Sequence, residues 1–323
     1  MTHALASTVL VVLTAAMQPL ARAEVGAQQW LERMSTASRS LNYTGIFVYQ
    51  HQNSLEAMQI VHAMDEGGER ERLFSLTGPK REVLRDNQVV TCILGDSQAV
   101  VVNKSRPRTS FPASFPRELE ELEKNYRFKV MGEDRVAGLA CREVAVQPRD
   151  AYRYGRRLCV HDQSHLLLRS ELTDARGRVI EQVMFTSVEF PQRISAQALL
   201  PNLDDAGFTW QREPEQQPEP GDSNPDSRWK VLQVPDGFML TDHNWHQLSA
   251  HEAGVEHWVY SDGLASVSVY IEKSQKKHDV YSGVSHRGAL NAFGTMVADY
   301  YVTVVGEVPR QTVELIGKSV RIQ

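Results

Sequence analysis

Two histidines in the run His161-Asp-Gln-Ser-His165 stand four residues apart, the spacing of the two zinc ligands on a metalloprotease helix. Such a site also needs helical geometry and a glutamate that acts as general base. The residues around this pair have the pattern of a strand and a turn, and the glutamate is missing. We therefore expect no metal site.

Catalytic motifs with a defined spacing are missing from the sequence. It has no GxxxxGK[ST] phosphate loop, no GxGxxG after a predicted strand and no GxSxG turn. Serine, histidine and aspartate are abundant, so a catalytic triad is unsupported rather than excluded. We expect a protein that is not an enzyme and that uses no cofactor. The histidines after residue 240 are either solvated side chains or a pH-responsive surface.

The three cysteines are expected to form one disulfide and to leave one free thiol. The segments that carry Cys141 and Cys159 have the pattern of two hairpin arms around Pro148-Arg149-Asp150. A turn centred on residue 150 sets these cysteines opposite each other, where antiparallel pairing brings Cβ atoms to about 4.5 Å, close to disulfide distance. Cys92 lies in an apolar run without a strong cationic neighbour, so we expect it to be a buried, unreactive thiol.

Positive side chains gather near predicted strand ends in the first two hundred residues. They are either solvated strand faces or a rim that binds carboxylate or phosphate groups, to which arginine can donate paired hydrogen bonds. The candidate rim consists of Lys80, Arg81, Arg85, Arg106 and Arg108. Further arginines in this part of the chain are Arg149, Arg153, Arg156 and Arg157.

The elements that position these residues begin with an amphipathic helix over 30–41, whose apolar residues recur with a helical period. Short β-type segments separated by turn formers follow, with a second helix over 117–126. The expected strands cover 43–50, 55–62, 71–76, 88–94, 99–103, 126–131, the cysteine hairpin, 166–174 and 179–190. Roughly ten antiparallel strands in one open sheet tend to curl, which predicts an α+β, β-rich fold with a half-open barrel.

Helices that cover a curled sheet leave an apolar cavity at its mouth, which is a common site for a lipid. Strand alternation places five side chains along the wall of this cavity. They are Phe47, Ile60, Phe74, Val90 and Ile93.

A second, smaller body follows a stretch that cannot form a core. Residues 211–228 contain four prolines and five acidic residues but no aliphatic side chain, so they form either a passive spacer or a stiff hinge. Beyond them, strands are expected over 231–234, 238–242, 245–248, 255–271 (a hairpin about Asp262-Gly263) and 298–306, with a closing helix from Pro309. We therefore divide the chain into 1–23, 24–210, 211–228 and 229–323.

The first 23 residues have the features of a secretory signal peptide. A short apolar core over 9–13 precedes Ala21-Arg22-Ala23, a small-x-small cleavage site, although no Lys or Arg lies in the first residues. No apolar run approaches the ~20 residues of a membrane-spanning helix. The net charge of −5 does not favour nucleic acid as a partner. We expect an exported, soluble chain.

Several motifs resemble the MucB/RseB family. They are Tyr43-Thr-Gly-Ile-Phe-Val-Tyr-Gln, Leu76-Thr-Gly-Pro-Lys-Arg-Glu-Val-Leu-Arg-Asp, Arg135-Val-Ala-Gly, the Pro-rich break near 220, and the spacing of Val231, Pro235, Gly237 and Phe238. The resemblance covers essentially the whole mature chain. It implies a large domain similar to the lipoprotein carriers LolA and LolB, followed by a small domain.

The resemblance also implies a function: a periplasmic negative regulator of the envelope-stress sigma-E pathway, which controls mucoidy in alginate-producing bacteria. Such a regulator binds the periplasmic part of a membrane anti-sigma factor (RseA or MucA), shields it from regulated proteolysis, and is released by lipid or lipopolysaccharide. A periplasmic lipid or lipoprotein carrier is the alternative, and assembly into a homo-oligomer stays open. Large aromatic side chains often anchor partners, although they serve equally well in cores. The candidates are Trp210, Trp229, Trp245 and Trp258.

Overall fold

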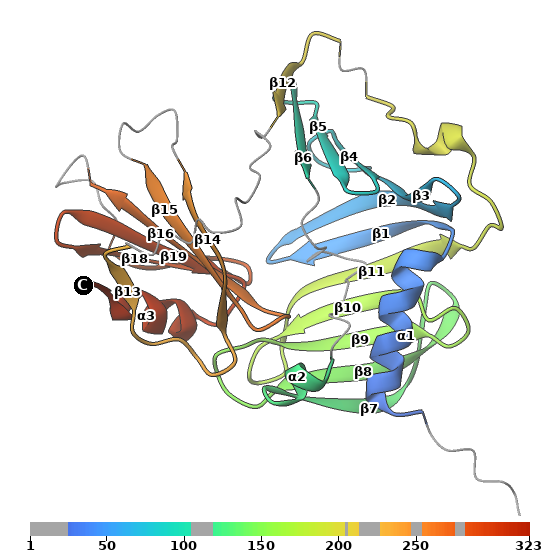
Figure 1. Ribbon diagram of the computed structural model, residues 1–323. Coiled ribbons are helices and arrows are strands. Elements are labelled where there is room, and N and C mark those ends of the chain that lie inside the picture. Colours follow the sequence, from blue (N-terminus) through green and yellow to red (C-terminus); the bar gives the residue numbers. More distant parts are fainter. Residues whose placement is uncertain (1–24, 105–118, 204–205, 213–226, 247–253, 275–281) are drawn as a thin grey trace, which may run out of the picture.

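The structure, a computed structural model, describes residues 25–104, 119–203, 206–212, 227–246, 254–274 and 282–323. The expected signal peptide, Arg106, Arg108 and most of the expected linker lie outside these ranges. The described chain forms a large sheet with helices on one face, and a smaller sheet with one helix (Figure 1). This arrangement confirms the β-rich α+β class.

The large sheet has twelve strands in the order β12-β6-β5-β4-β3-β2-β1-β11-β10-β9-β8-β7. All neighbouring pairs are antiparallel except β12 and β6, which are parallel. The strands are Tyr43–His51 (β1), Ser54–Asp65 (β2), Gly68–Ser75 (β3), Arg81–Asp86 (β4), Val89–Leu94 (β5), Ala99–Lys104 (β6), Tyr126–Val136 (β7), Leu139–Pro148 (β8), Gly155–His161 (β9), Leu167–Thr173 (β10), Val179–Glu189 (β11) and Thr209–Arg212 (β12). Since β7 and β12 are the two edges, the sheet does not close into a barrel.

Helix α1 (Ala27–Ser40) lies across the half of the sheet that contains β7 to β11 (Figure 1). Its apolar face buries Trp30, Leu31 and Met34. These side chains pack against Val144 and Leu158 of the sheet, together with the short helix α2 (Leu119–Glu123). The inner face of the sheet is therefore filled on one half by helices and remains available on the other.

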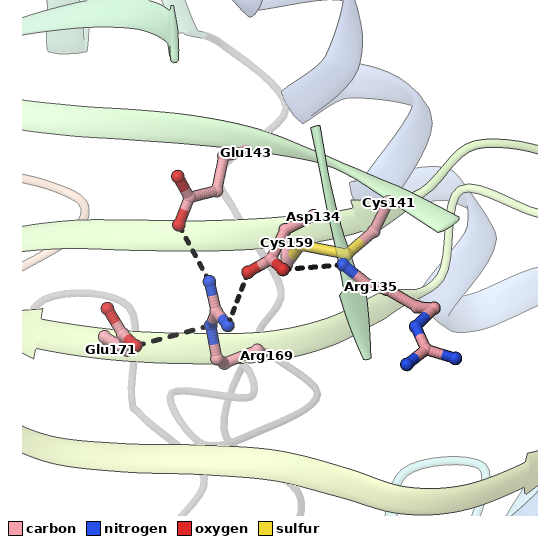
Figure 2. Close-up of a disulfide and its surroundings, with 7 residues drawn as sticks. All are labelled: Asp134, Arg135, Cys141, Glu143, Cys159, Arg169 and Glu171. Carbon is pink, nitrogen blue, oxygen red and sulfur yellow. Dashed lines mark hydrogen bonds and ion pairs between the residues drawn. A yellow bond between two sulfur atoms is a disulfide. The ribbon is translucent and has the colours of Figure 1, made fainter. Parts of the chain in front are cut away.

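The two predicted cysteines form a disulfide with an S–S distance of 2.06 Å, and both are fully buried (Figure 2). Their predicted register is wrong by two residues, because Cys141 lies opposite His161 and Cys159 lies opposite Glu143. The connection between β8 and β9 is longer than a tight turn at 150, because β8 ends at Pro148 and β9 begins at Gly155. The cysteines are thus diagonal neighbours, with Cα atoms 5.4 Å apart.

The smaller sheet has the order β14-β15-β16-β19-β18-β17. Helix α3 (Arg310–Ser319) packs on one face of it, and a two-stranded ribbon joins β13 to β20. The strands are Trp229–Val231 (β13), Met239–His246 (β14), Val255–Ser261 (β15), Ser266–Lys273 (β16), Gly283–Arg287 (β17), Leu290–Val297 (β18), Tyr300–Gly306 (β19) and Val320–Ile322 (β20).

Several predicted features of the elements were wrong. Strand β4 begins at Arg81, where the sequence predicts only a turn and a basic cluster. Strands β17 and β18 were missed because glycine and polar residues interrupt their apolar pattern. Residues 211–212 continue β12 instead of starting the linker, and β14 is one strand where two were expected.

Candidate functional site

A cavity of about 550 Å³ lies between the inner face of the large sheet and the smaller body. Strands β1 to β4 and β9 to β11 form most of its wall. The turn of the β15–β16 hairpin closes it from the other side with Leu264, Ala265 and Ser266, and Glu307 follows β19. Apolar wall residues are Phe47, Met58, Leu73, Val83, Leu172 and Val183.

The structure divides the five predicted lining residues between the two faces of the sheet. Phe47 lines the cavity. Ile60 is buried in the core on the same face, since it pairs with Gly45 two positions from Phe47. Val90 shares that face through its pairing with Arg85, but it does not reach the cavity.

Phe74 and Ile93 were predicted on the wrong face. Both pair with Glu82, and Leu73 on the cavity wall alternates with Phe74. The apolar pattern alone could not identify the face, because apolar side chains occur on both faces of this region. On this outer face, Arg72 and Glu82 form an ion pair with an N–O distance of 3.2 Å. Both side chains are nearly fully buried.

The segment that covers the outer face contains a 3₁₀ helix, Ala196–Leu199. Arg72 donates to the carbonyl of Ala198, and both carboxylate oxygens of Glu82 accept from the backbone N–H of Asn202, at 3.1 and 2.9 Å. A charged pair buried under this segment therefore holds it to β3 and β4. The sequence offered no signal for this buried ion pair beyond the presence of charged residues inside apolar strands.

The cavity carries polar groups among its apolar walls. Tyr49 donates to Glu181 at 2.8 Å, and burial together with this carboxylate raises the pKa of Tyr49 far above its usual value. Arg156 lies 3.6 Å from Glu307. About half of the Glu307 side chain is exposed at the cavity, yet the surrounding protein desolvates the carboxyl and raises its pKa against the opposing effect of Arg156.

Of the predicted basic rim, Arg81 lines the cavity and forms an ion pair with Glu56 at 2.9 Å. Arg85 is partly buried on the same face, whereas Lys80 is exposed at the turn before β4. Burial raises the pKa of the neighbouring Cys92 thiol, with Arg81 acting in the opposite direction. Cys92 is free but only partly buried, which corrects the prediction of a buried thiol.

The four candidate tryptophans divide into two pairs. Trp229 and Trp258 are 3% and 6% exposed and belong to the core of the smaller sheet, so their predicted role on a partner surface is wrong. Trp210 on β12 and Trp245 on β14 are 52% and 61% exposed, and each lies on an edge strand. Only this second pair is available for a partner.

The expectation about metal concerned His161 and His165. His161 lies at the end of β9, where its Nδ1 is 2.7 Å from Ser164 Oγ and its ring stacks on Phe190. Burial lowers the pKa of both histidines. Among the residues that the structure describes, no group of three or more His, Cys, Asp or Glu side chains is placed to hold a metal ion. In the same residues, no helix is long and apolar enough to cross a membrane.

Comparisons with known proteins match both bodies. Residues 26–203 match the MucB/RseB N-terminal domain, and residues 223–321 match the MucB/RseB C-terminal domain. The chain is 31% identical to the sigma factor AlgU regulatory protein MucB of Pseudomonas aeruginosa, over 98% of this chain and 97% of that protein. It is 25% identical to the sigma-E factor regulatory protein RseB of Escherichia coli, over 90% of this chain and 89% of that protein.

A solved structure has a similar fold over most of this chain. It is the crystal structure of MucB in complex with MucA(peri), which is 27% identical in sequence to this chain. The TM-score is 0.71, and the match covers 92% of this chain and 99% of that one.

Proposed function

The chain belongs to the MucB/RseB family, and we propose from this that it binds the periplasmic part of a membrane anti-sigma factor and restrains the sigma-E response to envelope stress. The observation that carries the proposal is the match of both domains to relatives that are sigma factor regulatory proteins. The solved complex of a relative with MucA(peri) supports the choice of partner. In this role the chain shields the anti-sigma factor from the protease that cuts it first.

The structure supports a role in binding rather than in catalysis. Its cavity brings together Tyr49, Glu181 and Glu307, but the phenol of Tyr49 is occupied by Glu181, and Glu307 lies beside Arg156. These pairs hold the walls of the cavity in place, as a binding site requires. A purified protein that hydrolyses an ester, peptide or phosphate substrate in proportion to its concentration would contradict this part of the proposal.

The cavity supports a lipidic signal as the ligand that releases the partner. Its volume of about 550 Å³ lies within the usual range for small-molecule sites, and most of its wall is apolar. Arg81 and Arg156 line it, and a guanidinium can bind a phosphate or carboxylate. The alternative, a lipid carrier, would use the same cavity, but it would not need a partner that is an anti-sigma factor.

The proposed location is the periplasm, as the expected signal peptide and the family both favour. Fusion of residues 1–30 to a reporter that is active only after export tests this location. Activity in the exported fraction is expected. A reporter that stays in the cytoplasm would contradict the signal peptide.

The direct test of the function is calorimetric titration of the mature chain with the purified periplasmic fragment of the anti-sigma factor. We expect saturable binding that weakens when lipopolysaccharide is present, since ligands that favour different states weaken each other equally. A matched control is Glu314→Gln, which removes only exposed ion pairs on α3. No binding by the folded wild-type chain would refute the proposal.

A further inference from the structure

Arg153 lies between the two domains and its side chain is fully buried. Its guanidinium donates to the carboxylates of Asp150 in its own loop and of Asp262 in the β15–β16 turn, and to the backbone carbonyl of Asp236. The rings of Tyr126 and Phe238 enclose it, with centroids 5.8 and 4.8 Å away. Each nitrogen of the guanidinium therefore has a specific partner, two of them in the smaller domain.

The partner carboxylate is as well enclosed as the arginine. The side chain of Asp262 is fully buried and accepts a hydrogen bond from the hydroxyl of Tyr126 at 2.9 Å. A buried charge without a partner is costly, so this contact is stable only when the two domains meet in one orientation. Apolar packing alone would allow the domains to slide, whereas these directional bonds do not.

The loop that carries Arg153, residues 149–154, makes further contacts with the smaller domain. Thr312 at the start of α3 donates to the carbonyl of Tyr152 at 2.7 Å, and Gln311 donates to the carbonyl of Ala151. Asn291 donates to the hydroxyl of Tyr154 at 3.0 Å. The single loop between β8 and β9 thus contacts α3, β18 and the β15–β16 turn.

The same turn is also a wall of the cavity. The second carboxylate oxygen of Asp262 accepts from the backbone of Leu264 at 2.9 Å and of Ala265 at 2.7 Å. These two residues, with Ser266, close the cavity. One carboxylate therefore binds the arginine of the large domain and shapes the cavity wall.

From these contacts we propose that Arg153 is a positioning residue that fixes the orientation of the two domains and, through Asp262, ties that orientation to the shape of the cavity. Its effect on partner binding rests on the function proposed above. Its effect on domain orientation does not. A molecule that pushes against residues 264–266 acts on the same turn that holds the domains together.

The test compares Arg153→Met with Arg169→Met in the full mature chain. Arg169 is a matched control, since it is also surrounded by carboxylates, those of Asp134, Glu143 and Glu171, but all of these belong to the large domain (Figure 2). A second variant, Asp262→Asn, removes the charge but keeps an oxygen for the hydrogen bonds within the turn. Circular dichroism establishes that each variant is folded.

Small-angle X-ray scattering measures the domain orientation. We expect a larger radius of gyration for Arg153→Met and Asp262→Asn, and the wild-type value for Arg169→Met. Affinity for the anti-sigma fragment should fall about tenfold in the first two variants, within the usual range for coupled sites. Affinity for the anionic dye anilinonaphthalene sulfonate, a probe of the cavity, should change several-fold in the same two.

Wild-type scattering from folded Arg153→Met and Asp262→Asn would overturn the proposal, as would an equal effect of Arg169→Met. Altered scattering with an unchanged affinity for the dye would overturn the tie to the cavity. If the wild-type chain does not bind the anti-sigma fragment at all, the proposed function fails, but the scattering comparison still tests the role of Arg153.

Discussion

Removal of the Cys141–Cys159 disulfide should destabilise the large domain by an amount that depends on the length of chain between the two cysteines. The two cysteines are separated by 18 positions. In the chain-entropy model, a link across a loop of this length lowers the entropy of the unfolded chain and is worth about 3 kcal/mol at 25 °C. Both cysteines are fully buried in the core of the large sheet, so reduction adds no compensating contact.

The assay is differential scanning calorimetry of the mature protein with and without a phosphine reductant. For a domain of this size, about 3 kcal/mol corresponds to a fall of roughly 6–12 °C in the unfolding midpoint. The transition of the large domain should shift, and that of the small domain should not. Cys92→Ala provides the control, because Cys92 is free and its removal should leave the effect of the reductant unchanged. Equal midpoints in both conditions, with reduction verified by thiol titration, would refute this reasoning.

Three further predictions concern buried charge, pH and the tryptophans. Arg72→Met leaves the Glu82 carboxylate buried without its ion-pair partner, so urea unfolding should show a loss of about 3–5 kcal/mol in the free energy of unfolding. Proteolysis should also cut the 194–202 segment faster, because Arg72 no longer donates to Ala198. An unchanged rate of cutting would contradict the role of the Arg72–Glu82 pair in holding this segment. The raised pKa of Glu307 means that its neutral form favours folding, a contribution present below the unfolded pKa of about 4.3 and lost as pH rises through the folded pKa. Glu307→Gln should therefore raise the thermal unfolding midpoint at pH 7 but not at pH 3.5. An equal shift of the midpoint at both pH values would contradict this effect of Glu307. Trp258→Ala should cost about 3–5 kcal/mol of stability, whereas Trp245→Ala should change stability by less than about 0.5 kcal/mol. Equal losses in urea unfolding would contradict the different burial of the two side chains.

Local patterns in the sequence were sufficient for most elements of the fold. The helical period of 30–41 and the alternation after Tyr43 correspond to α1 and to β1. The Asp262-Gly263 hairpin was found because a two-residue turn signal stands between alternating strands. These features depend on neighbours in sequence, which is why they can be predicted.

The face that each strand presents depends on distant contacts and was less predictable. Phe74 and Leu73 are adjacent and both apolar, and the choice between them depends on which face the 194–202 segment covers. The register of the disulfide was wrong for a similar reason, because the β8–β9 connection is held by residues of the smaller domain, such as Thr312, which donates to the carbonyl of Tyr152. Neither contact leaves a periodic signal.

The burial of Arg153 between the domains could not be predicted from the sequence, for the same physical reason. In the sequence it is one of four arginines in a basic stretch, and solvated strand faces or an anion-binding rim account equally well for such a stretch. Its burial depends on Asp262, which is 109 positions away. An arginine flanked by tyrosines in a loop between apolar strands was the one available hint.

The most direct measurement of the central claim is the rate at which the first protease cleaves the periplasmic fragment of the anti-sigma factor, under single-turnover conditions, with and without the mature chain. We predict that the chain slows cleavage in proportion to the fraction of fragment bound, and that lipopolysaccharide restores the rate. A cleavage rate that stays the same when the fragment is saturated with folded chain would contradict the account.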